Sequence, residues 1–266
     1  MTPKHVPKQV LTSCYGASDQ KLSMHLSIII PAYNEEQLIT HCLNAVAESL
    51  SANARTDFTH EIIVVDNNSA DKTAERARKS GAHVVFEPIN QISRARNAGA
   101  AAAKGDWLLF VDADSLLNPG MVADILACID SGRYVGCGSL MKMPESPWWG
   151  KVILKTWSIV SVTFAWASGA LVVCRSDAFR EVGGFDQNLY AADEIYLSGL
   201  LKQWGRRHGG LKFTILKHHP LITSARKLRL YSGSEIAKQF FKVACSPRKA
   251  LQNRNKLPIW YDGRRE

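Results

Sequence analysis

The sequence predicts a single α/β domain built on a mostly parallel sheet, with helices packed on its faces. Apolar segments without polar alternation recur through the first half of the chain, and strands of that kind are buried on both faces. Segments with helical spacing separate them, and this alternation implies parallel strands joined by right-handed crossovers. No linker-like segment divides the two halves, so we expect them to share one sheet.

The first half predicts four strands and four helices in alternation. Pro31 is expected to end the first strand, because proline cannot donate to a sheet ladder. Ser69 suits the N-cap of the second helix and Gly81 its C-terminal end. Pro119 suits the first turn of the fourth helix. The expected strands are residues 26–30, 61–65, 82–86 and 107–111, and the expected helices are residues 35–50, 69–81, 93–104 and 119–130.

The second half is less regular. Its expected strands are residues 133–141, 171–173 and 213–216, and its expected helices are residues 148–166, 177–182, 191–203 and 234–244. The longest apolar segment, residues 157–174, contains serine, threonine and glycine and is short for a membrane span. We therefore predict a buried helix followed by a strand there, with a span as the alternative. We divide the chain into a loose leader (1–24), the main domain (25–226) and a basic helical extension (227–266).

The charge of the chain is uneven. The net charge is +9, but residues 202–266 alone hold 16 Lys and Arg against 3 Asp and Glu. Such asymmetry favours an anionic partner. An anionic membrane surface is one candidate, and a solvated basic tail is the alternative. The basic region lacks interleaved aromatic residues and any nucleic-acid motif, so no nucleic-acid partner is expected.

Cysteine usage and the start of the chain indicate where the protein works. The six cysteines show no C-x-x-C spacing, which argues against a zinc site or a disulfide framework. The first residues lack the apolar core of a secretory signal. We therefore predict a cytoplasmic protein, peripheral at the inner face of a membrane if the basic extension binds lipid.

The strongest local signal is a pair of carboxylates, Asp112 and Asp114, directly after the apolar strand 107–111. Hard oxygen ligands at a strand end suit a divalent cation such as Mg²⁺ or Mn²⁺. The alternative is a solvated turn. Glu35 and Asp66 follow two other predicted strands, and in open α/β sheets the carboxyl ends of the strands form the ligand site.

Seven short motifs follow one another along the chain. They are Pro31-Ala32-Tyr33-Asn34-Glu35, the segment from Val64 to Thr73, Ser93-Arg94-Ala95-Arg96-Asn97-Ala98-Gly99, Asp112-Ala113-Asp114, Ser168-Gly169-Ala170, Gly183-Gly184-Phe185-Asp186 and Asp193-Glu194. Their order resembles that of the family 2 nucleotide-sugar glycosyltransferases, which have the GT-A fold, a Rossmann-like mixed and mostly parallel sheet flanked by helices. The resemblance covers about residues 24–226.

The resemblance implies a donor site and a metal site. Asp66 would contact the base of the nucleotide, and Arg96 with Asn97 would hold the diphosphate and orient the metal-binding aspartates. Asp114 would bind the metal, and Asp112 would face the ribose or the metal. The remaining donor-binding residues would be Pro31, Ala32, Tyr33, Glu35, Ala113 and Gly169. The alternatives are a turn role for Asp66, a helix-dipole role for Glu35 and a surface position for Arg94.

The family also places an acidic pair, usually Glu-Asp, at a helix start in the second half. Here the order is reversed, Asp193-Glu194. By position Glu194 would be the general base, with Asp193 in support, although either carboxylate could serve; two exposed helix-start carboxylates are the alternative. His218 is a candidate third metal ligand, because some GT-A enzymes take one from this region. An exposed surface histidine is the alternative there.

These expectations describe an inverting, metal-dependent glycosyltransferase. It would move one sugar from a nucleoside diphosphate sugar, UDP-linked rather than GDP-linked, to the hydroxyl of a lipid-linked or saccharide acceptor. The processive Q-x-x-R-W motif is absent from the sequence, which favours single transfer. The alternatives are a non-catalytic nucleotide-sugar or membrane-surface binding module, and a nucleotidyltransferase. The latter usually has a glycine- and lysine-rich loop where this chain has Pro-Ala-Tyr-Asn-Glu.

Overall fold

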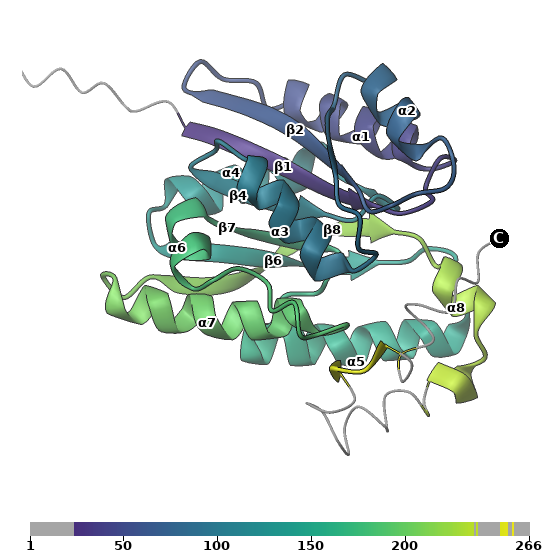
Figure 1. Ribbon diagram of the computed structural model, residues 1–266. Coiled ribbons are helices and arrows are strands. Elements are labelled where there is room, and N and C mark those ends of the chain that lie inside the picture. The colour runs from purple at the N-terminus through teal and green to yellow at the C-terminus, as the bar shows by residue number, and fades with distance from the viewer. Residues whose placement is uncertain (1–23, 237, 239–250, 255–256, 258–266) are drawn as a thin grey trace, which may run out of the picture.

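One mixed sheet runs through the molecule in the order β3-β2-β1-β4-β7-β6-β8-β5 (Figure 1). The computed structural model describes residues 24–236, 238, 251–254 and 257. The strands are β1 Met24–Ala32, β2 Phe58–Asp66, β3 His83–Phe86, β4 Trp107–Val111, β5 Ser115–Leu116, β6 Tyr134–Lys142, β7 Leu171–Arg175 and β8 Lys212–Thr223. The predicted α/β fold with a mostly parallel sheet is confirmed.

Antiparallel β7 makes the sheet mixed. β1 pairs in parallel with β2 and β4, and β2 pairs in parallel with β3. β7 lies antiparallel between β4 and β6, so the chain that enters β7 passes beside the carboxyl end of β4. That geometry brings the Ser168–Ala170 segment to Asp112, whose backbone N–H donates to the carbonyl oxygen of Ala170 at 3.3 Å.

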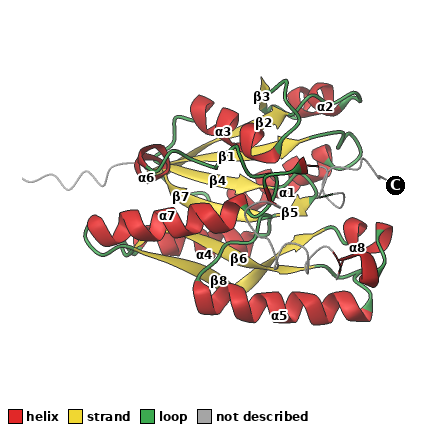
Figure 2. Cartoon of the chain, turned by 60° about the horizontal axis from the view of Figure 1, so that its bottom comes forward, coloured by secondary structure: helices red, strands yellow, loops and turns green. Residues whose placement is uncertain are grey.

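Helices cover both faces of the sheet (Figure 2). Side chains of α1, α2 and α4 pack into one apolar core, and side chains of α3, α6 and α7 pack into the other. α5 runs along the bottom of the molecule in both views and meets α7 where Lys202 Nζ lies 2.8 Å from the carbonyl oxygen of Phe164. The helices are α1 Ile39–Ser51, α2 Thr73–Lys79, α3 Ile92–Ala102, α4 Pro119–Asp130, α5 Trp148–Phe164, α6 Ser176–Glu181, α7 Asp193–Arg207 and α8 Arg226–Leu230.

Two local predictions were wrong. β1 continues through Pro31 to Ala32. Its pairing with β4 ends at Ile29, so Pro31 pairs with a strand on one side only. The strand tolerates this proline because its position is equivalent to one on an edge strand. The N-cap of α2 is Lys72 rather than Ser69. The Ser69 hydroxyl instead accepts a hydrogen bond from the backbone N–H of Asn34 at 3.0 Å, which joins two loops of the site.

Other boundaries differ in the second half. β8 is longer than predicted, and β5 and α8 were not predicted at all. Residues 157–174 form the end of α5, a link and β7, which confirms a helix followed by a strand. The predicted burial of the helix was wrong, since Ile159 and Phe164 are 63% and 54% exposed. Among the described residues, no helix combines the length and hydropathy needed to cross a bilayer. The predicted leader lies outside the described residues apart from Met24, and of the predicted helix 234–244 the structure describes residues 234–236 and 238, which are helical.

Candidate active site

The candidate site lies at the carboxyl ends of β1, β2 and β4. Asp66 ends β2 opposite Ala32 of β1, and Asp112 follows the last residue of β4. Parallel pairing of these three strands therefore gathers, on one edge, the acidic residues that the sequence places after separate strands. The predicted clustering at this edge is what the topology produces.

Arg96 is the cation at the centre of the site. It lies on α3, and its side chain is only 3% exposed. Its Nη2 donates to the carbonyl oxygen of Gly169 at 2.7 Å and to Asp112 Oδ1 at 3.2 Å, and its Nη1 lies 3.3 Å from Asp193 Oδ2. Burial opposes the charge, but the carboxylates of Asp193 and Asp112 outweigh it and raise the pKa of Arg96. A permanent buried cation thus joins α3, β4, the link before β7 and the start of α7.

The acidic pair divides into a buried and an accessible carboxylate. Asp193 is 1% exposed and is committed to Arg96. Glu194 is half-buried. Burial and then the negative charge of Asp193 raise the pKa of Glu194 to about 8, although Arg96 acts in the opposite direction. A carboxyl group with a pKa near the working pH is suited to proton transfer.

Gly169 provides room beside the side chains of Arg96 and Glu194. A Cβ atom at this position would lie 3.3 Å from Glu194 Oε1 and 3.5 Å from Arg96 Nη2. Any side chain would therefore press on the Glu194 carboxylate and touch the Arg96 guanidinium at van der Waals distance. The glycine leaves this part of the site open to a ligand.

Asp112 and Asp114 flank a residue that points into the core. Ala113 is 4% exposed, whereas the side chains of Asp112 and Asp114 are 33% and 20% exposed. Asp114 Oδ1 accepts a hydrogen bond from Thr223 Oγ1 at 3.4 Å. Two partly accessible carboxylates are a donor set that fits Mg²⁺ or Mn²⁺, since Mg²⁺ at phosphate sites is commonly held by one or two carboxylates together with substrate phosphates.

Arg226 is a site residue that the sequence reasoning missed. It begins α8 and forms a two-pronged contact with Glu35, with Nη2 2.6 Å from Oε1 and Nη1 3.2 Å from Oε2. Its Nη2 also lies 3.9 Å from Asp114 Oδ2. One arginine within a long basic segment gives no signal in the sequence. Its contact with Glu35 shows that this glutamate, expected to bind the donor, is held by a cation from the end of the main domain.

The loops after β1 and β2 form a hollow of about 300 Å³ beside Arg226. The left-handed residue Asn34, with φ of 49°, accepts a hydrogen bond from the backbone N–H of Ala70 at 2.8 Å. The backbone N–H of Glu35 donates to Thr73 Oγ1 at 2.8 Å. These cross-loop bonds fix the walls of the hollow, which the remaining lining residues complete: Glu36, Gln37 and Asp71.

The other predicted donor-binding residues differ in accessibility. Pro31 and Ala32 are buried within β1, so they can offer a ligand only their backbone, whereas Tyr33 is half-buried at the strand end. Asp66 is 7% exposed, and one of its oxygens accepts the backbone N–H of Ser69 at 3.0 Å. Asp66 therefore has the turn role considered as its alternative, while its second oxygen makes no hydrogen bond with the described residues.

Asn97 holds a turn. Its side-chain Nδ2 donates to the carbonyl oxygen of Phe185 at 2.8 Å, and its Oδ1 accepts the backbone N–H of Phe185 at 3.0 Å. The Phe185 ring in turn lies 5.1 Å from the guanidinium carbon of Arg96. The amide is thus used to position the ring beneath the central cation.

The structure does not bring His218 to the two aspartates. It is exposed and lies within β8, where the pairing with β6 is irregular. Across the described part of the chain, no group of three or more His, Cys, Asp or Glu side chains is gathered closely enough to hold a metal ion. His219, the residue after His218, contacts Asp124, with His219 Nδ1 3.0 Å from Asp124 Oδ2.

Two related proteins each match about two fifths of the chain. An uncharacterised glycosyltransferase of Haemophilus influenzae is 33% identical over 112 residues, which are 41% of this chain and 36% of that protein. The poly(ribitol-phosphate) β-N-acetylglucosaminyltransferase TarS of Staphylococcus aureus is 32% identical over 114 residues, which are 40% of this chain and 19% of that protein. The chain therefore spans well under two thirds of the length of these relatives.

Solved structures share the fold over most of the chain. A mannosyltransferase of Pyrobaculum calidifontis, in complex with GDP-Man and Mn²⁺, has a TM-score of 0.64 at 17% identity and covers 85% of this chain and 62% of its own. Glucosyl-3-phosphoglycerate synthase of Mycobacterium tuberculosis, in complex with Mn²⁺, UDP-glucose and phosphoglyceric acid, has a TM-score of 0.55 at 18% identity. The match covers 86% of this chain and 80% of that chain. The family model described as Glycosyl transferase family 2 matches residues 27–173, more than half of the sequence. The chain belongs to glycosyl transferase family 2.

Proposed function

We propose that the chain transfers one sugar, with inversion, from a nucleoside diphosphate sugar to an acceptor hydroxyl. The observation that carries the proposal is the buried contact of Arg96 with both Asp112 and Asp193, which links a candidate donor edge to a candidate base. The two solved structures named above hold GDP-mannose or UDP-glucose with Mn²⁺. A UDP-linked donor is our expectation for this chain.

The donor would lie along the ends of β1, β2 and β4. The free oxygen of Asp66 would accept a hydrogen bond from the base, and the backbone at Pro31 and Ala32 would line the nucleotide. Asp114 and Asp112 would hold Mg²⁺ or Mn²⁺, which supplies positive charge to the departing diphosphate. Arg96 supports this arrangement by fixing the orientation of Asp112.

Glu194 would take the acceptor proton. As the proton moves to Glu194, the acceptor oxygen attacks the anomeric carbon from the face opposite the diphosphate. The bond between that carbon and the diphosphate oxygen breaks, and the nucleoside diphosphate leaves with the electron pair. The half-buried position of Glu194 beside Gly169 and its raised pKa support this role, whereas Asp193 is already paired with Arg96.

Donor hydrolysis tests the proposal without knowledge of the acceptor. We expect slow, Mn²⁺- or Mg²⁺-dependent hydrolysis of one sugar nucleotide out of a panel of UDP and GDP sugars. Asp114→Asn and Glu194→Gln should each reduce the rate, whereas Glu48→Gln on the exposed face of α1 should not. Donor binding without turnover, unchanged by Glu194→Gln, would instead favour the non-catalytic binding module.

A further inference from the structure

The outward face of α5 carries exposed apolar side chains, with the exposed Lys155 among them. Trp148, Val152, Ile159 and Val162 are 78%, 58%, 63% and 36% exposed. Their spacing of 4, 7 and 3 residues places all four on one side of the helix. Only Gly150 and Ser161 of this helix are buried, so α5 does not owe its apolar composition to a place in the core. Several large apolar side chains exposed together on one face of a helix are typical of an interaction site.

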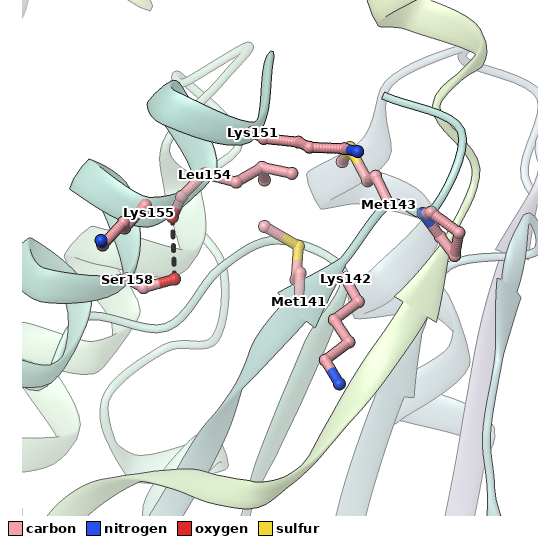
Figure 3. A pocket seen from close by; sticks show the side chains of 8 residues that line it. Met141, Lys142, Met143, Lys151, Leu154, Lys155 and Ser158 are labelled. Atoms are coloured by element: carbon pink, nitrogen blue, oxygen red, sulfur yellow. Dashed lines mark hydrogen bonds between the residues drawn. The ribbon is translucent and has the colours of Figure 1, made fainter. Parts of the chain in front are cut away.

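Basic side chains accompany this apolar face. Lys151 and Lys155 are exposed on α5, and Lys142 is exposed at the end of β6. The three lysines surround an open hollow of about 430 Å³ whose walls include Met141, Met143 and Leu154 (Figure 3). None of these lysines forms an ion pair with a residue that the structure describes, and residues 146–176 contain no Asp or Glu. The neighbouring acid, Glu145, is paired with Arg229, so the unpaired charges beside the apolar residues are basic.

This combination fits the boundary layer of an anionic bilayer. An interfacial helix places tryptophan and aliphatic side chains among the upper acyl chains and its lysines among the headgroup phosphates. A protein partner would need an apolar surface with acidic residues in matching positions. We propose that α5 lies in the surface of an anionic membrane, with lipid phosphates at Lys142, Lys151 and Lys155.

The position of α5 connects the membrane to the candidate site. The link between α5 and β7, residues 165–170, contains Gly169 of the candidate site. The ring of Phe164 at the end of α5 stacks on Trp166 in this link, with 4.9 Å between the ring centroids. A helix docked on lipid would therefore hold this side of the site near the membrane. The residues of this surface, 142–162, differ from the basic extension 227–266 that the charge count singles out, and its binding needs neither donor nor acceptor.

Vesicle flotation with the full chain tests the proposal. Binding is expected to phosphatidylglycerol-containing vesicles and not to pure phosphatidylcholine vesicles. Trp148→Ser with Ile159→Ser, and separately Lys151→Glu with Lys155→Glu, should each lower the partition coefficient at least about tenfold. The matched controls are Phe86→Ser with Ile89→Ser, which are 59% and 51% exposed elsewhere, and Arg78→Glu with Lys104→Glu, and both should bind like the wild type.

Quenching by brominated lipids gives a second, direct readout. Vesicles with bromine at shallow acyl positions should quench the fluorescence of the wild type, and Trp148→Phe should lose most of that quenching while remaining bound. Three results would overturn the proposal: no binding of the wild type to anionic vesicles, binding unchanged by both α5 variants, or a concentration-dependent dimer that Trp148→Ser abolishes. None of these results depends on the sugar-transfer proposal.

Discussion

Replacing Glu194 by glutamine should make the protein more stable and less active, with a stability gain that depends on pH. Glu194 has a pKa of about 8 in the folded state, against an ordinary value of 4.5. Between these two values the folded protein binds the proton more tightly than the unfolded chain, so the stability of the wild type falls as the pH rises through this range. Glutamine carries no such charge and avoids this loss.

The size of the gain follows from the two pKa values. Their difference of about 3.5 corresponds to at most about 5 kcal/mol at 1.36 kcal/mol per pH unit. Because the side chain is half-buried, solvent screens part of this energy, and we expect about 1–2 kcal/mol. For a domain of this size that raises the melting temperature by about 2–8 °C above pH 8, with little change near pH 5.

Thermal unfolding of both proteins at pH 5 and pH 9 measures this difference, and Glu48→Gln serves as the exposed-carboxylate control. Donor turnover of Glu194→Gln should fall about 10²–10⁴-fold, the usual contribution of a general base. Equal melting temperatures at pH 9, or a gain of the same size at both pH values, would refute the assignment of a raised pKa to Glu194. Full turnover would refute its role as the base.

Three further variants test other parts of the site. Asp193→Asn should lower the free energy of unfolding by about 3 kcal/mol in urea titrations, because it removes the charge paired with buried Arg96. Asp114→Asn should abolish the extra thermal stabilisation that Mn²⁺ adds to a bound sugar nucleotide, while leaving the metal-free melting temperature within about 1 °C. Gly169→Ala should reduce kcat about tenfold or more through the 3.3 Å approach to Glu194, with a change in unfolding free energy below about 1 kcal/mol.

The fold and the acidic edge could be predicted because their signals are local. Asp66 and Asp112 follow apolar strands directly, and parallel pairing is enough to bring strand ends together. The antiparallel direction of β7 could not be predicted from the sequence. The composition of a short, mostly apolar strand of five residues is the same whether the strand pairs in parallel or antiparallel. β5 has only two residues and exists through its pairing with β8, so its own composition could not reveal it.

The contacts that organise the site could not be predicted, because they join residues far apart in sequence. Arg96 meets Asp193 97 positions away, and Arg226 meets Glu35 191 positions away. Asn97 was expected to help hold the donor, yet its amide binds the backbone of Phe185. Sequence patterns identified the chemistry of these residues but not their partners, since the partners are set by how α3, α7 and α8 pack on the sheet.

The reversed order of the acidic pair has a physical explanation in this packing. Ala192, with φ of 60°, turns the chain into α7 so that the first helical carboxylate, Asp193, enters the buried space beside Arg96. The next carboxylate, Glu194, then faces the space that Gly169 leaves open. The short side chain thus fills the enclosed position, and the long one lies half-buried beside Gly169. With the order Glu-Asp, the longer carboxylate would have to fit beside Arg96, and the accessible one would be shorter by a methylene group. The arrangement in this chain therefore keeps both a paired counter-ion for the buried cation and a carboxylate that can take a proton.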